Sequence, residues 1–129
     1  MKTLKISTSK RSDMVDITLP VQKAVSDMGT EHGICTVFVP HTTAGVTINE
    51  GADPDVCYDV LKKLDSMVPE ESSYRHMEGN SDSHVKASLI GSSVSVIVED
   101  SRLMLGTWQK IFFCDFDGPR SRKIYVNFP

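Results

Sequence analysis

The sequence has few cysteines and no closely spaced pair of them. Cys35, Cys57 and Cys114 are an odd number, and no C-x-x-C motif occurs. A disulfide framework or a thiolate zinc knuckle needs paired cysteines, so neither is indicated. Each cysteine follows an apolar residue, which favours three small buried hydrophobic side chains over a catalytic thiol.

Long apolar runs are missing as well. No stretch of the sequence approaches the ~18 consecutive apolar residues of a membrane-spanning helix. The amino-terminal stretch MKTLKISTSKRSDM lacks the continuous apolar segment of a signal peptide. We therefore expect a cytoplasmic protein that has no membrane partner.

An excess of positive charge is also absent. The 14 lysines and arginines are outnumbered by 17 aspartates and glutamates, giving a net charge of −3. Proteins that bind nucleic acid through its phosphates are usually basic, so no nucleic-acid partner is expected. The average conceals a basic cluster, Arg120, Arg122 and Lys123, which could bind a small anionic or phosphorylated ligand. A solvent-exposed hairpin would contain the same residues.

The length allows one domain. The 129 residues match the size of one compact domain, commonly ~100–150 residues. No internal repeat is found, so we expect a single domain over residues 1–129.

The hydrophobic pattern predicts more strands than helices. Alternation or β-branched residues predict strands at 4–9, 14–19, 33–39, 43–49, 94–98, 103–116 and 122–128, with 4–9 and 14–19 as a hairpin. Residues 117–120 are expected to join the last two strands as a second hairpin. Because neighbouring strands lack strict βαβ alternation, we predict an α+β fold, a mainly antiparallel β-sandwich with outer helices.

Three helices and one long loop complete the prediction. Pro20 opens a helix that stops near Gly29, and Asp53 caps a helix that runs to Pro69. A short helix is expected from a cap at Ser81 or Asp82 to Gly91. Residues 70–82 form a polar loop between the last two helices, and loops of this length are often functional.

Polar residues of chemically useful types gather at three places. The first follows the strand ending at Val39: His41, Thr42 and Thr43, then Asn49, Glu50 and Asp53 where the next strand ends. Strand ends present side chains from a rigid scaffold. For His41, a rim histidine bonded to a backbone group and a functional histidine are equally good interpretations.

The second place contains His76, Asn80, Asp82 and His84. The two imidazoles lie on either side of a glycine, so the loop could bring them to one centre. With His41 they would form a three-imidazole metal site with one open position, although three surface histidines would give the same count. Asp82 is equally well explained as a helix cap.

The third place is the segment around the only tryptophan, Trp108. Packing in a core or interface is the commonest use of this residue. Gln109 points to the opposite face of a strand and could meet either a ligand or a neighbour in the sheet.

Six segments together carry a resemblance to a known family. They are HTTAGVTINE (41–50), DPD (53–55), YRH (74–76), EGNSDSHVKASL (78–89), LGTWQ (105–109) and FDGPR (116–120). In this order, over nearly the whole chain, they resemble the YjbQ family, also called the secondary thiamine-phosphate synthase family. One departure is Ser101, where that family usually has a glycine, so the tight turn there is expected to be altered.

The resemblance implies a fold, an assembly and an activity. It implies a homotrimer of YjbQ-like α+β domains with polar residues in a pocket near the subunit interfaces. The implied activity is a weak, secondary thiamine-phosphate synthase reaction, which joins hydroxymethylpyrimidine diphosphate to thiazole phosphate and releases pyrophosphate. A divalent metal ion, zinc, magnesium or calcium, is the expected cofactor.

The candidate roles can be assigned residue by residue. The expected catalytic residues are His41, Asn49, Glu50 and Gln109. The expected substrate- or phosphate-binding residues are Thr42, Thr43, Asn80, Trp108, Arg120 and Arg122. The expected metal ligands are His41, His76 and His84, with Glu50 and Asp53 as carboxylates for a magnesium ion.

Two alternative functions stay open. The trimer could bind a small anionic metabolite without turning it over, with the same residues serving affinity alone. A three-histidine site with an open position would also suit a metal-assisted hydrolase.

Overall fold

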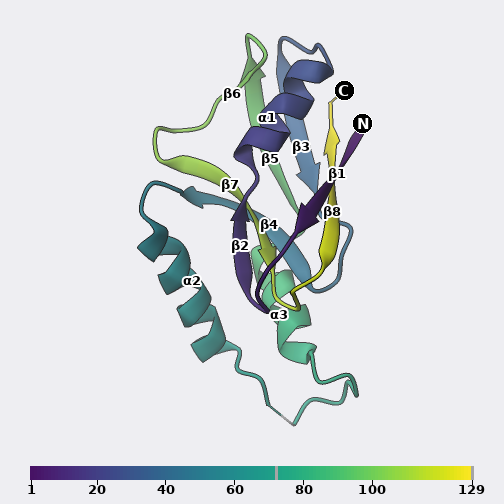
Figure 1. Cartoon of the computed structure of the whole chain (residues 1–129), viewed down its shortest axis with the longest axis vertical. Helices are drawn as coiled ribbons and strands as arrows, with labels where there is room; N and C mark the ends of the chain where they lie inside the picture. Colours follow the sequence, from purple (N-terminus) through teal and green to yellow (C-terminus); the bar gives the residue numbers. More distant parts are fainter. Residues whose placement is uncertain (72, 129) are drawn as a thin grey trace.

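The computed structural model describes residues 1–71 and 73–128 (Figure 1). In these residues eight strands and three helices follow one another: β1 (Lys2–Ser7), β2 (Asp13–Asp16), α1 (Thr18–Asp27), β3 (Gly33–Phe38), β4 (Ala44–Glu50), α2 (Pro54–Met67), α3 (Ser81–Ile90), β5 (Ser93–Glu99), β6 (Arg102–Leu103), β7 (Gln109–Asp115) and β8 (Ser121–Asn127). No helix of the described residues combines the length and hydrophobicity needed to cross a membrane.

The strands form two antiparallel sheets. The five-stranded sheet has the order β1-β8-β3-β5-β6, and the three-stranded sheet has the order β2-β7-β4. The predicted α+β fold with two antiparallel sheets and three helices is therefore confirmed. The main core lies between the sheets and α1, and includes Val25, Val37, Val46, Phe113 and Ile124.

The three-stranded sheet is buried on both faces. Ile111 and Phe113 of β7 point into the main core, whereas Phe112 and Cys114 point to a second cluster with Leu61 of α2 and residues of α3. Strands covered on both faces have continuous apolar sequences. This explains why residues 103–116 suggested one long strand, although β6 and β7 are separate and belong to different sheets.

Both predicted hairpins are wrong. Strand β1 pairs with β8, and β2 pairs with β7. Strands β7 and β8 lie in different sheets, so residues 117–120 carry the chain from one sheet to the other. Alternation shows which side chains share a face, but it does not identify the neighbouring strand.

The helix ends follow local signals only in part. Helix α1 begins at Thr18, two residues before the predicted start at Pro20, and Asn80 stands before α3 in place of the predicted cap at Ser81 or Asp82. Oδ1 of Asp53 accepts a hydrogen bond from the Asp55 N–H at 2.9 Å, as predicted for the cap of α2. Helix α3 stops at Gly91, which has φ of 95°. The alternative role of Asp82 as a cap is wrong, because α3 already begins at Ser81 and Asp82 is 1% exposed within its first turn.

A tight hairpin joins β5 and β6. Asp100 and Ser101 have φ values of 50° and 61°, in the left-handed region that favours glycine. Gln22 of α1 holds this turn: its Nε2 donates to the Ser101 carbonyl at 2.8 Å, and its Oε1 accepts from the Leu103 N–H at 3.0 Å. The chain therefore forms the turn without glycine and anchors it by a side chain distant in sequence.

The three cysteines are free; Cys35 and Cys114 are buried, as predicted, whereas Cys57 is only partly buried. Burial raises the pKa of Cys35 to about 11 and that of Cys114 to about 12. At neutral pH both thiols are protonated, so they act as small hydrophobic side chains.

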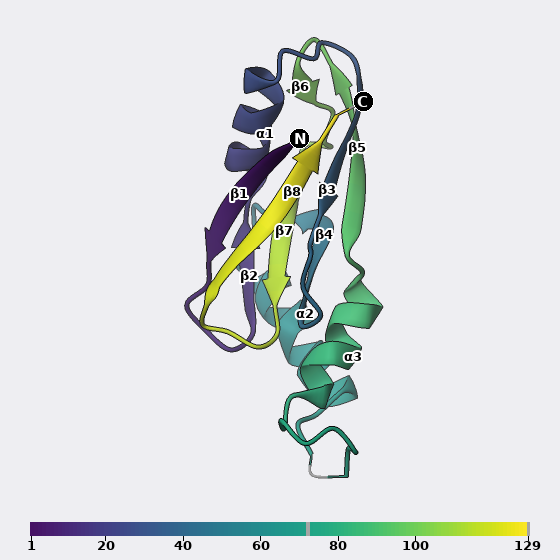
Figure 2. The ribbon, with the colours of Figure 1, turned by 90° about the vertical axis from the view of Figure 1, so that its right-hand side faces the viewer.

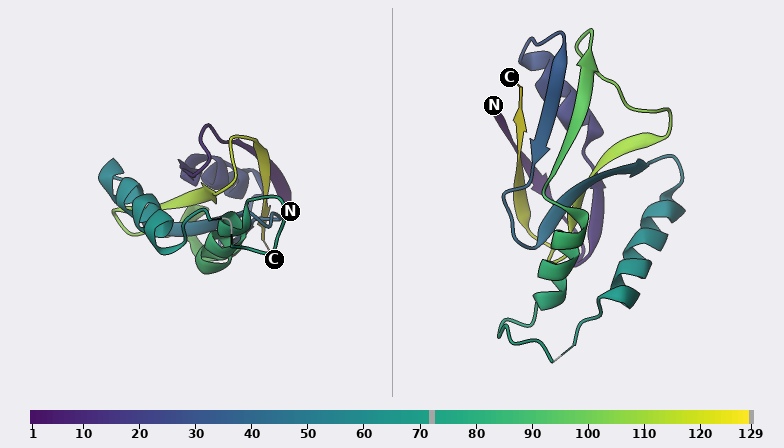
Figure 3. Two further views of the ribbon diagram at one scale, coloured as in Figure 1. Left: turned by 90° about the horizontal axis from the view of Figure 1, so that it is seen from below. Right: turned by 180° about the vertical axis from the view of Figure 1, so that it is seen from behind.

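Helix α3 lies at one end of the molecule, and α2 runs toward this end from the far end of β4 (Figure 1). Figures 2 and 3 show α3 at the lower ends of the strands and α2 beside it, with the described residues 73–80 before α3 farther from the sheets. This end of the molecule also contains the loop between β3 and β4 and residues 117–120 between β7 and β8.

Candidate functional site

The predicted site residues lie in two groups at opposite ends of β4. With about 3.3 Å per residue, this seven-residue strand separates the groups by about 20 Å. The histidine end contains His41, Thr42, Thr43, His76, Asn80, His84, Arg120 and Arg122. The tryptophan end contains Asn49, Glu50, Asp53, Trp108 and Gln109, with Glu50 opposite Gln109 in the sheet.

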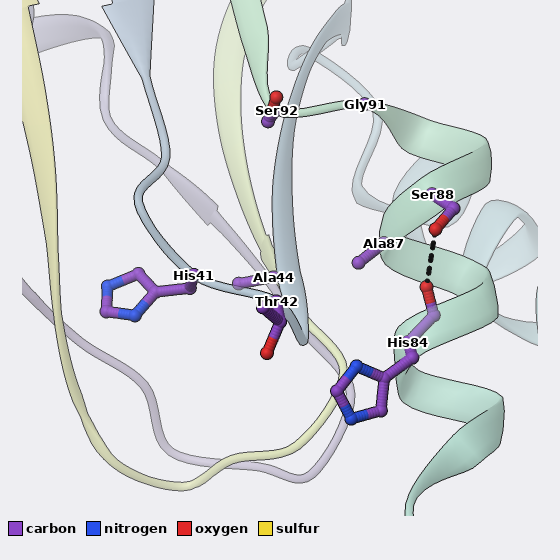
Figure 4. Close-up of a pocket in the computed structure, with 8 residues that line it drawn as sticks. All are labelled: His41, Thr42, Ala44, His84, Ala87, Ser88, Gly91 and Ser92. Atoms are coloured by element: carbon purple, nitrogen blue, oxygen red, sulfur yellow. Dashed lines mark hydrogen bonds between the residues drawn. The ribbon is translucent and has the colours of Figure 1, made fainter.

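A cleft with two compartments opens at the histidine end. The polar compartment, a cavity of about 390 Å³, is lined by charged and polar residues of the β3–β4 loop, the loop before α3 and the segment after β7. The neutral compartment, about 540 Å³, is lined by the start of β4 and by α3 up to Ser92 (Figure 4). The compartments adjoin, because His41, Thr42 and His84 line both.

Two of the three predicted metal-binding histidines are brought together. The rings of His76 and His84 are 5.2 Å apart between centroids and nearly perpendicular. The ring of His41 points away from His84, toward β8 (Figure 4). Within residues 1–71 and 73–128, no three His, Cys, Asp or Glu side chains are placed to hold one metal ion. The described residues of one chain therefore do not assemble the predicted three-imidazole arrangement.

His41 is bonded to the backbone of β8. Its Nε2 accepts a hydrogen bond from the Lys123 N–H at 3.0 Å and lies 3.2 Å from the Lys123 carbonyl oxygen. Burial, followed by the charge of Arg122, lowers the pKa of His41. The neutral ring with its proton on Nδ1 suits the shorter contact. The imidazole thus occupies a place beside β8 beyond the end of β3, which matches the backbone-bonded interpretation.

Arg122 belongs to a buried ion pair. Its side chain is 5% exposed, and its Nε and Nη2 donate to both oxygens of the fully buried Asp115 at 3.2 and 2.7 Å. Nη2 also donates to Thr43 Oγ1 at 2.8 Å. Burial alone would raise the pKa of Asp115, but the bonds from Arg122 and Thr8 outweigh it and lower that pKa. The Nε and Nη2 donors of Arg122 are therefore taken by Asp115 and Thr43, so Arg122 is less available than Arg120 for the phosphate-binding role predicted for both.

Arg120 is more accessible to a ligand. Its Nε and Nη2 donate to the carbonyl and carboxylate of Asp117 at 2.8 and 3.1 Å, which uses two of its five N–H donors. The side chain is 51% exposed. Arg120 is oriented by Asp117 while it keeps donors for an anion.

Asn80 holds an unsatisfied acceptor in the same compartment. Its Nδ2 donates to Asp117 Oδ2 at 2.9 Å. An ionised carboxylate can only accept hydrogen bonds, so the NH₂ group of Asn80 faces Asp117, and this fixes the orientation of the amide. Its Oδ1 is buried, and no described residue donates to it. Buried acceptors are rarely left without a donor, so this atom marks a position for a donor from water or ligand.

A second ion-pair network supports the helix that carries His84. Arg11 donates to both oxygens of Asp82 at 3.0 and 3.1 Å, and Lys86 donates to Asp82 at 3.3 Å. Burial alone would raise the pKa of Asp82, but these partners outweigh it and lower that pKa.

One signal in the sequence could have identified the buried ion pairs. Asp115 interrupts an otherwise apolar run, and a charge in such a run is tolerated only when it has a partner.

The tryptophan end is more exposed and locally bonded. Trp108 is 62% exposed, so it does not pack in the core of the chain. Gln109 Oε1 accepts from the Gly106 N–H at 2.8 Å, and Asn49 Oδ1 accepts from the Glu50 N–H at 2.7 Å. The predicted pair of metal-binding carboxylates, Glu50 and Asp53, lies at this end of β4 and is therefore far from Arg120.

Comparison with known proteins gives a consistent result. Residues 2–129 match the family model of UPF0047 proteins that are YjbQ-like. The UPF0047 protein YugU of Bacillus subtilis is 52% identical over 127 residues, covering 98% of this chain and 96% of YugU. A UPF0047 protein of Methanocaldococcus jannaschii is 50% identical, covering 94% and 88%.

Solved structures resemble the whole chain. A YjbQ/UPF0047-family protein of Clostridium acetobutylicum matches with a TM-score of 0.96 and 51% identity, and 98% of each chain is covered. A conserved hypothetical protein of Thermus thermophilus matches over 100% of both chains, with a TM-score of 0.93 and 40% identity.

Proposed function

The chain belongs to the YjbQ-like UPF0047 family, and from this membership and the cleft at the histidine end we propose that it is a weak thiamine-phosphate synthase. The proposed reaction joins hydroxymethylpyrimidine diphosphate to thiazole phosphate and releases pyrophosphate. The observation that carries the proposal is the polar compartment itself, where a half-exposed Arg120 lies in the same cavity as the His76–His84 pair.

The reaction needs stabilisation of a leaving anion. The bond between the pyrimidine methyl carbon and the diphosphate oxygen breaks, and its electron pair leaves with pyrophosphate. The thiazole nitrogen gives its lone pair to the same carbon, so the new ring nitrogen is cationic. In this proposal Arg120 binds the diphosphate, Asn80 Oδ1 accepts a hydrogen bond from substrate, and His84 donates a hydrogen bond to a phosphate oxygen.

We also propose that His76 and His84 bind a divalent metal ion. Two imidazoles suit zinc better than magnesium or calcium, which prefer oxygen ligands. When bound, such an ion would supply positive charge for the leaving diphosphate. His41 could join it only by giving up the contact of Nε2 with Lys123 or by using Nδ1. Elemental analysis of the H76A and H84A variants tests this part: unchanged metal content in both variants would show that the imidazole site is wrong.

The two ends of β4 suggest a site shared between copies. The proposed homotrimer would let Glu50, Trp108 and Gln109 of one subunit complete the cleft of the next, although they lie about 20 Å from it within a subunit. A test uses hybrids of H84N, defective at the histidine end, with E50Q, defective at the tryptophan end. If each site uses one end from each of two neighbours, random mixing restores about a quarter of the sites. Hybrids no more active than either variant alone would contradict sharing.

The primary test is pyrophosphate release from both precursors by the purified protein. We expect release above the background rate, and at least about a tenfold loss in R120Q, because one charge-assisted contact is removed. The matched control is R102Q, which removes an arginine of β6, the strand at the edge of the five-stranded sheet that does not line the cleft. A wild-type rate at background would refute the synthase, and ligand-induced thermal stabilisation in the same sample would then support a binding protein.

A further inference from the structure

The cleft is divided by charge. The polar compartment contains arginine, aspartate and glutamate side chains, whereas the neutral compartment has no lining side chain of these types among the described residues. Its walls consist of the small residues Ala44, Ala87 and Gly91, the hydroxyls of Thr42, Ser88 and Ser92, and the two shared histidines (Figure 4). An anion therefore has its counter-charge in one compartment only.

Backbone hydrogen bonds fix the walls of the neutral compartment. The Val46 N–H of β4 donates to the Gly91 carbonyl at 3.1 Å, and the Val39 N–H donates to the Ser92 carbonyl at 2.8 Å. The two backbone segments approach so closely at this point that a Cβ on Gly45 would lie 2.5 Å from the Gly91 carbonyl oxygen. The start of β4 and the end of α3 are thus held together, which makes this a preformed wall rather than a gap between mobile segments.

We propose that the neutral compartment binds the uncharged heteroaromatic ring of a phosphorylated substrate, while the polar compartment binds its phosphate. This inference rests on the proposed function and assigns its substrate class to parts of the same site. Small walls leave space for a flat ring, and neutral hydroxyls and imidazole can bond ring nitrogens or an amino group without requiring charge. The volume of about 540 Å³ is within the usual range of small-molecule pockets.

The test compares a ligand with a ring and one without. Isothermal titration measures the affinities of hydroxymethylpyrimidine diphosphate and of inorganic pyrophosphate for the wild type, S88L and S26L. Ser88 lines the neutral compartment and bonds to the His84 carbonyl four residues earlier, and Ser26 of α1 makes the same bond to the Gln22 carbonyl, so S26L is the matched control. S92L fills the compartment from its other side and serves as a second variant.

We expect S88L and S92L to lower the affinity for the pyrimidine diphosphate at least about tenfold, because a leucine occupies the space of the ring. The affinity for pyrophosphate should change by no more than about twofold. S26L should change neither affinity. Equal losses for both ligands, or no loss for either, would overturn the inference.

The outcome can be separated from that of the proposed function. If the wild type binds the pyrimidine diphosphate more tightly than pyrophosphate but releases no pyrophosphate with thiazole phosphate, the ring site stands and the synthase fails. If the two ligands bind equally well while turnover occurs, the synthase stands and the ring site fails. If the wild type binds neither ligand, both proposals fail.

Discussion

Both ends of β4 carry side chains predicted to form a site, but the structure holds them differently. At the histidine end, Arg122 is 5% exposed and bonded to the buried Asp115. At the tryptophan end, Trp108 is 62% exposed and Asn49 bonds to the next residue in the chain. Contacts between distant segments fix His41 and Asn80 at the histidine end, where Arg120 is held by a near neighbour, Asp117. At the tryptophan end, Asn49 and Gln109 bond to near neighbours in the chain.

The structure gives residues of the same type different tasks. Arg122 connects β8 to β7 inside the protein, whereas Arg120, two residues earlier, keeps donors at an open cavity. Asp53 caps a helix, and Asp82 anchors one through Arg11. Residue type therefore gives a list of candidates, and the partners of each side chain decide which candidates are available to a ligand.

The largest expected effect comes from breaking the buried ion pair at the histidine end. R122M leaves the carboxylate of Asp115 buried without its main partner, and we expect a loss of roughly 3–5 kcal/mol in the free energy of unfolding. R120M removes an exposed pair and should cost no more than about 1 kcal/mol. Urea unfolding measures both, and equal losses would show that the contrast between these arginines is wrong.

A change outside both ends should alter stability alone. S101G removes the strain of a side chain at a left-handed φ of 61°. We expect the free energy of unfolding to rise by about 0.5–1 kcal/mol after the added entropy of the unfolded chain is subtracted. S95G, in the middle of β5, should instead lose about 0.5–1 kcal/mol. Neither variant should change pyrophosphate affinity. A lower urea midpoint for S101G would contradict the expected relief.

A smaller effect concerns the pH dependence of stability. The pKa of His41 is lowered in the folded protein from its ordinary value of 6.5. His41 therefore binds a proton more readily in the unfolded chain than in the folded protein. As the pH falls below about 6.5, protonation of His41 favours the unfolded chain, and the free energy of unfolding decreases. H41Q should show a weaker decline in urea midpoint between about pH 8 and about pH 5.5 than the wild type. Identical declines would refute the assignment of a neutral His41.

The smallest effect on stability is expected at the tryptophan end. E50Q changes a half-buried side chain without changing its shape, and the free energy of unfolding should stay within about 0.5 kcal/mol of the wild type. If the site is shared between copies, turnover should fall although stability does not. Unchanged turnover in E50Q would restrict the site to the histidine end.

Much of the local structure could be predicted because its causes are local. Asp53 followed by Pro54 predicted the start of α2, and glycine at 91 predicted the end of α3. The hydrophobic alternation of β5 and β8 predicted both strands. The candidate cleft was predicted in part: His76 and His84 do meet, but His41 turns toward β8.

The sequence by itself determined most of the helices and strands, the burial of Cys35 and Cys114 and the list of polar candidates, because these depend on neighbouring residues and on hydrophobic periodicity. Only the tertiary structure decided that β1 pairs with β8 and β2 with β7, and that Arg122 is bound to Asp115 and Asp82 to Arg11. Such pairings join residues far apart in the chain and depend on which buried charges can be satisfied together. Local sequence patterns give no information about these strand pairings and ion pairs.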